Sequence, residues 1–244
     1  MKPIGDLVRG GLLVGALVLL AACAGEEGPA ADVQGEYQVD VDPDEFVAVI
    51  DNPYLPLPAG ARHVYEAQTE DGLERVVVEV LPETRQVMGI TATVVRDTVT
   101  LDGVVVEDTL DWFAQDEDGN VWYLGEEVGN YENGQLVDRT GSWEAGIDGA
   151  LPGIVMYADP IAHAATPYRQ EYYPGQAEDM AEVLDATETV STPTGSYTEL
   201  LRTLETTPLE PAVREHKYYA RGVGLVQAVD LVSGEVLQLV EVTP

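Results

Sequence analysis

The chain has 244 residues with 12 lysines and arginines against 44 aspartates and glutamates, which gives a formal charge of −32. Such an acidic protein repels phosphate backbones, so a nucleic-acid partner is disfavoured. The single cysteine, Cys23, can form neither an internal disulfide nor a cysteine-rich zinc site. The hydrophobic content of 45% is typical of a folded globular protein.

Residues 1–22 predict an export signal. Lys2 and Arg9 give it a positive start, and the apolar run over residues 10–22 is shorter than the roughly 20 residues that span a bilayer. The run ends in the sequence LAAC at Cys23, which resembles the lipobox of bacterial lipoproteins. This resemblance implies cleavage before Cys23, acylation of Cys23 by chains such as palmitate, and an extracytoplasmic protein anchored to the cell membrane or outer membrane. The alternative is an ordinary signal peptide with an incidental cysteine.

The mature chain would begin with a flexible tether. Residues 23–40 are mostly small or acidic and have no periodicity, which is typical of a solvated linker. Removal of residues 1–22 leaves 10 basic and 43 acidic residues, a charge of −33. We expect residues 41–244 to form a single β-rich domain.

Two short segments have features of helices. Asp42 can cap a helix that begins at Pro43, so residues 42–50 predict a short N-terminal helix. Residues 176–184 are a second candidate, because acidic residues suit a first helical turn.

From residue 62 onward the hydrophobic pattern alternates with period two, which indicates strands. Asp-Gly, Asn-Gly and similar turn signals separate these strands, at residues 71–72, 102–103, 118–120, 133–134, 148–149, 195–196 and 233–234. The pattern predicts an antiparallel meander of about ten strands. An open or closed barrel would bury its apolar face, and a two-sheet sandwich is the alternative.

Several longer stretches are distinctive, and no nucleotide-binding glycine motif interrupts them. They are residues 51–60 (DNPYLPLPAG), 107–126 (EDTLDWFAQDEDGNVWYLGE), 141–146 (GSWEAG), 169–175 (RQEYYPG) and 218–224 (YYARGVG). Together they resemble a group of uncharacterised bacterial lipoproteins and secreted proteins over nearly the whole mature chain. The resemblance implies export and a single domain, and it assigns no catalytic residues.

The hairpin around residues 102–103 gives candidate site residues. If these two residues form the turn, Leu101 faces Val104, and Asp97 lies directly opposite Asp108. Both aspartates then point to the more apolar face of the sheet. Opposed like charges are destabilising, so the pair requires an explanation.

A third carboxylate falls near this pair. Depending on the register of the next hairpin, Leu110 faces either Glu126 or Glu127. Asp97, Asp108 and Glu126 are therefore candidate ligands for a hard cation such as Ca²⁺. Alternatively, a shared proton would make the aspartates an acid/base pair. A third possibility is that a bulge turns one aspartate into water or that an arginine neutralises it.

The leading interpretation is a non-enzymatic, lipid-anchored binding protein for a small ligand, a divalent cation or both. The ligand-binding residues, the ligand and the oligomeric state are not predicted, and no residue is assigned as catalytic. One alternative is an exported hydrolase that uses the inward carboxylates. Another is an envelope interaction or scaffold protein, which requires a broad exposed apolar patch. His63, His163 and His216 are too dispersed in the sequence to predict a zinc site.

Overall fold

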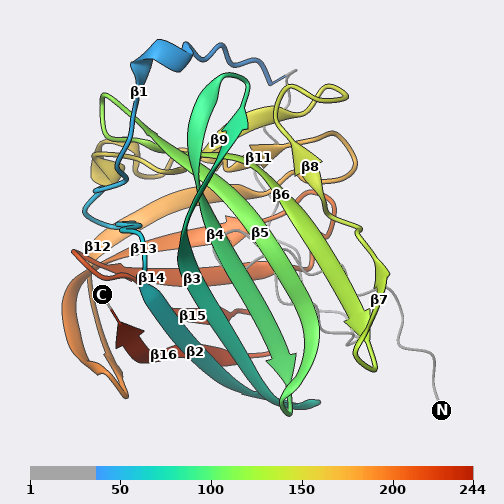
Figure 1. Ribbon diagram of the computed structural model, residues 1–244. Helices are drawn as coiled ribbons and strands as arrows, with labels where there is room; N and C mark the ends of the chain where they lie inside the picture. The colour runs from blue at the N-terminus through green and yellow to red at the C-terminus, as the bar shows by residue number, and fades with distance from the viewer. Residues whose placement is uncertain (1–36, 244) are drawn as a thin grey trace.

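The computed structural model describes residues 37–243 and shows a mainly antiparallel β-fold (Figure 1). Cys23, the predicted signal peptide and most of the predicted tether lie outside the described residues. The elements in chain order are η1 (Pro43–Glu45), β1 (Phe46–Val47), β2 (Arg62–Thr69), β3 (Gly72–Val87), β4 (Ile90–Leu101), β5 (Val104–Asp116), β6 (Val121–Glu132), β7 (Gln135–Asp138), β8 (Trp143–Glu144), β9 (Leu151–Met156), η2 (Pro160–His163), β10 (Tyr168–Arg169), β11 (Glu171–Tyr172), β12 (Met180–Thr192), β13 (Gly195–Thr206), β14 (Arg214–Ala220), β15 (Gly224–Asp230) and β16 (Val236–Thr243).

Tight turns join β4 to β5 and β6 to β7 where the sequence predicts them, whereas the turn predicted at residues 195–196 lies at residues 193–194, before β13. Asp102 and Gly103, between β4 and β5, have φ angles of 48° and 79°. Asn133 and Gly134, between β6 and β7, have φ angles of 51° and 75°. Two successive positive φ angles define the type I′ turn, which matches the twist of an antiparallel pair.

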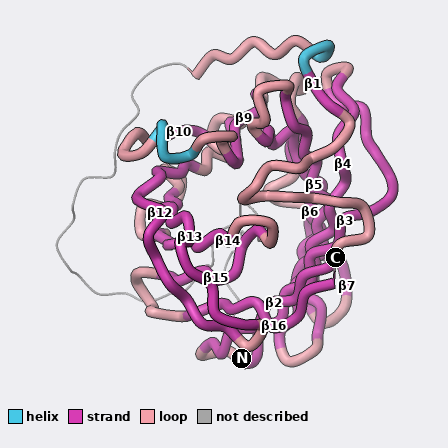
Figure 2. Tube along the Cα trace, turned by 90° about the vertical axis from the view of Figure 1, so that its left-hand side faces the viewer, coloured by secondary structure: helices cyan, strands magenta, loops and turns pink. Residues whose placement is uncertain are grey.

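Thirteen strands follow one another by hydrogen bonding in the order β10-β12-β13-β14-β15-β16-β2-β3-β4-β5-β6-β9-β11. The short strands β1, β7 and β8 pair with β5 or β6 beside this path. Figure 2 shows these strands arranged in a ring. The predicted antiparallel barrel is therefore confirmed, with more strands than the ten or so expected, and the sandwich alternative is wrong.

The ring closes at a short segment, residues 168–172, which we call the seam. Its first two residues, β10, pair with β12, and its last two, β11, pair with β9. Gln170 forms a bend between them. Each of these ladders contains two residue pairs, whereas β3 and β4 share eleven. These are the shortest ladders along the ring, and the next shortest, between β15 and β16 and between β6 and β9, have three pairs each.

Gly153 allows this closure. A Cβ atom built on Gly153 would lie 2.3 Å from the carbonyl carbon and oxygen of Gln170. Backbone atoms cannot rotate away as a flexible side chain can, so any larger residue at this position would push β9 away from the seam.

Both predicted helices are corrected by the structure. Residues 42–50 contain only one 3₁₀ turn, η1, after which Phe46 pairs with Asp116 as part of β1. Residues 176–184 do not form a helix, because β12 begins at Met180 and pairs with β13. In both cases an available strand edge outweighs a weak local helix preference.

Candidate functional site

The structure places Asp97 and Asp108 on opposite faces of the barrel wall, so the predicted carboxylate pair does not form. Asp97 is fully buried on the inner face of β4, where its Cα partners are Val78 and Thr109. Asp108 lies on the outer face of β5, and Arg96 donates to both of its oxygens at 2.7 Å. The two aspartates therefore cannot share one cation or one proton.

A β-bulge explains this correction. Leu101 faces Val104 as predicted, but the register shifts by one residue at residues 99–100. Since side chains alternate between faces, a slip of one residue reverses the face on which a predicted partner lies. Asp108 is consequently the Cα partner of Thr98. The outcome combines the two alternatives stated above, a bulge and a neutralising arginine.

Glu126 does lie on the inner face, but its neighbour is Asp111. These two residues are direct Cα partners on β5 and β6. Glu171 from the seam completes a group of three buried carboxylates, and at most 5% of any of these three residues is exposed. We call Asp111, Glu126 and Glu171 the seam acids. Asp111 and Glu126 lie on consecutive strands of one hairpin, and barrel closure brings Glu171 beside them.

Aromatic side chains surround the seam acids. The Tyr123 hydroxyl donates to Asp111 Oδ1 at 2.6 Å, and Trp143 Nε1 donates to Glu171 Oε2 at 3.0 Å. The Tyr123 ring stacks on Phe113 with centroids 4.8 Å apart and meets the Trp143 ring edge-on at 5.3 Å. These contacts fix one oxygen of Asp111 and one of Glu171 and place apolar ring surface beside them.

The seam acids have no cation of their own in the described part of the chain. None of the ion pairs there includes Asp111, Glu126 or Glu171. Asp111 Oδ2 and Glu126 Oε2 are buried without a hydrogen-bond partner. Burying a charge without compensation is costly, so this group favours either bound protons or a bound cation.

The pKa values of these carboxyls reflect that environment. Burial raises the pKa of Asp111 to about 7, although the Tyr123 hydroxyl opposes the shift. Burial, together with the charges of neighbouring carboxylates, raises the pKa of Glu126 and of Glu171 well above the usual range. Near neutral pH the group therefore holds protons that a cation could displace.

A second group of buried acids, on β13 and β14, contains a lysine. Lys217 Nζ lies 2.7 Å from Glu205 Oε2 and 3.6 Å from Glu215 Oε2. The Tyr219 hydroxyl donates to Glu205 Oε1 at 3.1 Å. Burial lowers the pKa of Lys217, but the charges of Glu205 and Glu215 outweigh it and leave that pKa raised. We call Lys217, Glu205 and Glu215 the lysine cluster.

Asp179 connects the two groups at the seam. Its backbone N–H donates to Glu171 Oε1 at 3.4 Å. Burial raises the pKa of Asp179 to about 7, and the charge of Lys217 partly opposes this shift. The seam acids and the lysine cluster are therefore adjacent parts of one acidic interior.

No preformed metal site is found in residues 37–243. No group of three or more histidine, cysteine, aspartate or glutamate side chains in that range has the arrangement needed to hold a metal ion. Asp97, Asp108 and Glu126 accordingly do not form a ready set of calcium ligands. His63, His163 and His216 each lie against a different tyrosine ring.

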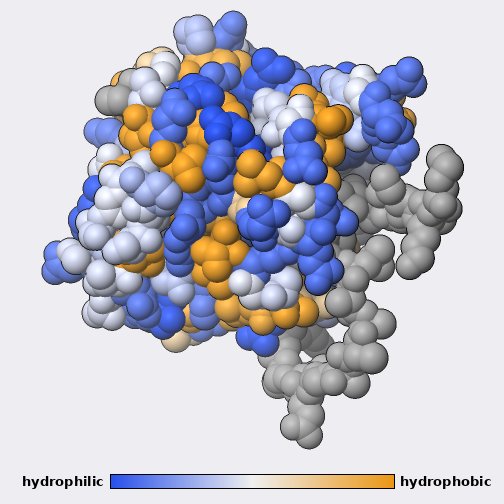
Figure 3. All heavy atoms as spheres, turned by 90° about the horizontal axis from the view of Figure 1, so that it is seen from below, coloured by the Kyte–Doolittle hydropathy of each residue, from blue (hydrophilic) through white to orange (hydrophobic). Residues whose placement is uncertain are grey.

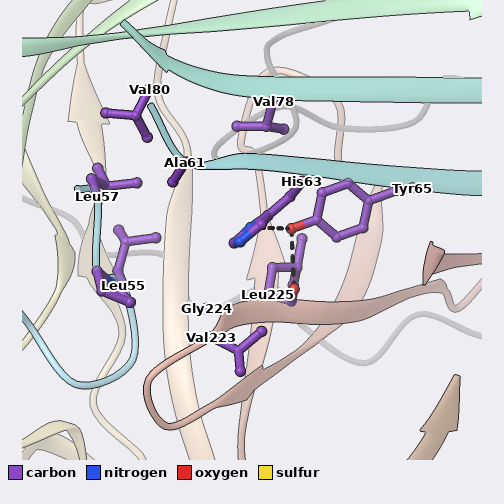
Figure 4. Close-up of a pocket in the computed structure, with 11 residues that line it drawn as sticks. Leu55, Leu57, Ala61, His63, Tyr65, Val78, Val80, Val223, Gly224 and Leu225 are labelled. Atoms are coloured by element: carbon purple, nitrogen blue, oxygen red, sulfur yellow. Dashed lines mark hydrogen bonds between the residues drawn. The ribbon is translucent and has the colours of Figure 1, made fainter. Parts of the chain in front are cut away.

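A small pocket lies beside His63, away from the seam acids (Figure 4). Its volume is about 20 Å³, which is enough for roughly one water molecule. Tyr65 donates to the Leu225 carbonyl at 3.0 Å and lies 3.5 Å from His63 Nδ1. The other walls of the pocket are formed by residues of β3, of the segment before β2 and of the start of β15. This pocket is too small for an organic ligand.

The face of the molecule in Figure 3 has no broad patch of hydrophobic residues. Hydrophobic side chains on this end of the barrel are interspersed with hydrophilic ones. Within the described residues, no helix is both long and apolar enough to cross a membrane.

Sequence reasoning missed most of the site. Asp111 and Glu171 are brought beside Glu126 by two separate strand pairings, and the pairing at the seam has no local signal. One signal for the lysine cluster was present. Lys217 is the only lysine after Lys2, and it lies in a strand-like stretch two residues after Glu215. A lone lysine that shares a strand face with a glutamate is a candidate for a buried ion pair.

The fold and the site define an antiparallel barrel with an acidic interior. Neither the scan of protein-family models nor the search of curated proteins finds a match to this chain. Among solved structures, the chain is similar to a Parabacteroides distasonis protein that is assigned as a lipoprotein. The two share 13% identity over 78% of this chain and 98% of that chain, with a TM-score of 0.42. Residue roles do not transfer at that level of identity.

Proposed function

We propose that this protein is an exported, lipid-anchored barrel that binds a small organic cation, such as a protonated amine, at the seam acids. The lipobox at Cys23 supports the anchor. One observation carries the binding proposal: Asp111, Glu126 and Glu171 are buried together, have no cation among the described residues, and leave two carboxylate oxygens without a hydrogen bond.

An ammonium group has the properties that this site lacks. It carries a positive charge and three N–H donors, so it can bond Asp111 Oδ2 and Glu126 Oε2 at the same time. The neighbouring rings of Tyr123 and Trp143 would contact its carbon chain and attract its charge. Binding would therefore remove both the uncompensated charge and the unpaired oxygens.

An organic cation fits better than Ca²⁺. Calcium takes about six to eight oxygen ligands at about 2.3–2.6 Å, which requires a close, preformed set of donors. No such set of acidic side chains exists in the described part of the barrel. An ammonium or guanidinium group can instead bridge carboxylates that are farther apart.

Because the seam acids are buried, a ligand needs a route to them. The two-residue ladders of the seam are the shortest ladders along the ring. Local opening takes place preferentially at such weakly bonded segments. We therefore place ligand entry at residues 168–172.

The test is isothermal titration of the full-length protein, in detergent micelles, with butylamine at about pH 8, where Asp111 with its pKa of about 7 is mostly ionised. The expected result is saturable binding that the double variant Asp111→Asn/Glu126→Gln loses. The matched control is Asp108→Asn/Glu127→Gln, which changes outward-facing acids on the same two strands and should bind normally. Saturation by CaCl₂ and not by butylamine would contradict the choice of an organic cation.

The anchor is tested separately by labelling cells with a palmitate analogue. The wild-type protein should be labelled and should sediment with membranes, whereas Cys23→Ala should do neither. Labelling of the Cys23→Ala variant would contradict lipidation at this residue.

The hydrolase alternative was based on Asp97 and Asp108, and these two residues face opposite sides of the wall. The scaffold alternative requires a broad apolar patch, and the face in Figure 3 has interspersed residues instead.

A further inference from the structure

Gln170 has an unusual environment for an amide side chain. Only 1% of this residue is exposed, yet neither its Nε2 nor its Oε1 has a hydrogen-bond partner. Its backbone is well bonded, since the N–H donates to the Asp179 carbonyl at 2.9 Å. Buried amides without partners are rare in folded proteins, because the lost hydration is not replaced.

Gln170 forms the bend of the seam and directly precedes Glu171, one of the seam acids. Arg169 and Tyr172 lie against each other, with the guanidinium carbon 4.4 Å from the ring centroid. Tyr37 covers that same side and packs edge-on against Tyr172 at 5.3 Å. The two residues between them, Gln170 and Glu171, are both buried, so the unpaired amide lies next to a seam acid along the chain.

Two further features accompany the unpaired amide. The Tyr168 hydroxyl, two residues earlier, is also buried without a hydrogen-bond partner. Burial and the charge of Glu205 raise the pKa of Tyr168 well above its usual value, so the hydroxyl keeps its proton. The backbone of Gln170 is pressed against Gly153 and cannot move away without shifting β9. The backbone that carries the unpaired amide is therefore packed closely against β9.

We propose that Gln170 and Tyr168 form a neutral polar subsite beside the seam acids, and that the ligand is an amine that also carries an amide group. This inference rests on the proposed function, since the seam acids hold the amine. An amide is the natural complement of Gln170, because each offers one carbonyl acceptor and N–H donors. Gln170 and Glu171 are consecutive, so a short chain of carbon atoms is enough to join the two groups of the ligand.

The chemistry predicts strong discrimination against analogues. A ligand that places an apolar group against Gln170 leaves the side-chain amide of Gln170 without hydrogen bonds. A ligand with an amide group at the same place can form those hydrogen bonds. Sites built to hydrogen-bond a ligand reject analogues that lack the bonding group far more strongly than apolar pockets reject a missing methylene.

The experiment compares two probes of nearly equal shape, γ-aminobutyramide and isohexylamine, by isothermal titration of the full-length protein in detergent micelles. The amide probe should bind at least about tenfold more tightly to the wild-type protein. Gln170→Met should remove that preference and leave the affinity for isohexylamine within about twofold. Gln86→Met, an exposed position on β3, is the matched control and should keep the preference.

Three outcomes overturn the inference, and they separate it from the proposed function. Equal affinity of the wild-type protein for the two probes contradicts the polar subsite, and this measurement does not depend on any variant folding. If the folded Gln170→Met variant still prefers γ-aminobutyramide, the amide group of the ligand binds somewhere other than at Gln170. In both cases the proposed function stands if Asp111→Asn/Glu126→Gln abolishes binding of both probes. Binding of neither probe to the wild-type protein overturns both proposals together.

Discussion

The seam acids and the lysine cluster bury the same kind of side chain on adjacent parts of the barrel interior, yet they differ in one cation. Lys217 lies within ion-pair distance of Glu205 and Glu215. Asp111, Glu126 and Glu171 have no such partner among the described residues. A buried carboxylate that has its own lysine is part of the structure. A buried carboxylate that lacks one is available to a cation from outside.

The largest effect is expected when the lysine cluster loses its cation. Lys217→Met would leave Glu205 and Glu215 buried without compensation, and removal of one partner of a buried ion pair costs about 3–5 kcal/mol. In a chain of this size that corresponds to a fall in Tm of about 6–20 °C. Differential scanning calorimetry at neutral pH measures it.

The control for this prediction is Arg96→Met, which removes a cation from an exposed pair with Asp108. Exposed ion pairs contribute at most about 1 kcal/mol, so its Tm should change little. Similar losses in the two variants would mean that burial of Lys217 does not distinguish the lysine cluster.

A smaller effect is expected from Gly153→Ala at the seam. The new methyl group would meet the backbone of Gln170 at 2.3 Å, and overpacking of this kind costs about 1–3 kcal/mol. Hydrogen exchange should show faster exchange at residues 168–172 than in the wild-type protein. Gly129→Ala is the control, because its nearest atoms lie at 3.1 Å and none of them belongs to the seam. Unchanged exchange at the seam in Gly153→Ala would contradict this account of closure.

The pH dependence of stability should reveal the raised pKa values. Asp111, Asp179 and Glu215 have pKa values of about 7 in the folded protein, whereas unfolded carboxyls titrate near about 4. Between these values the folded protein binds more protons than the unfolded chain, so the free energy of unfolding falls as pH rises. Each group contributes up to about 1.4 kcal/mol per pH unit.

Chemical denaturation between about pH 4 and pH 8 measures this dependence. Asp111→Asn should reduce the slope, whereas Asp108→Asn on the outer face should keep the wild-type slope. A slope of the opposite sign, or one that Asp111→Asn leaves unchanged, would show that Asp111 is not the buried acid described here.

The barrel could be predicted from the sequence because turns and strand pairs between neighbours are specified by short stretches of residues. Asp102-Gly103 and Asn133-Gly134 specify type I′ turns, and the alternating strands on either side of them specify antiparallel pairs. The helix predicted at residues 176–184 is wrong because the conformation there depends on a contact that is distant in sequence. Pairing with β13, which is distant in sequence, stabilises Met180 and its neighbours as a strand.

The site could be predicted only in part, because it depends on register and closure. The bulge at residues 99–100 shifts the pairing by one residue and moves Asp108 to the outer face. Glu126 was one of two residues expected opposite Leu110, but the structure pairs Leu110 with Glu127 and Glu126 with Asp111. Glu171 and Gln170 join the site through the seam, and no spacing in the sequence reports a contact between the two ends of a sheet.

The most direct test compares the seam acids with the lysine cluster by replacing one buried carboxylate by an amide in each of them. Asp111→Asn and Glu205→Gln each replace a buried carboxylate by an amide that can still accept from the tyrosine hydroxyl beside it. Their Tm values at about pH 8, without added amine, should move in opposite directions. Asp111→Asn should raise the Tm because it removes an uncompensated charge, and Glu205→Gln should lower it because Lys217 loses its nearer partner. A similar fall in both variants would contradict the claim that the seam acids lack a cation of their own.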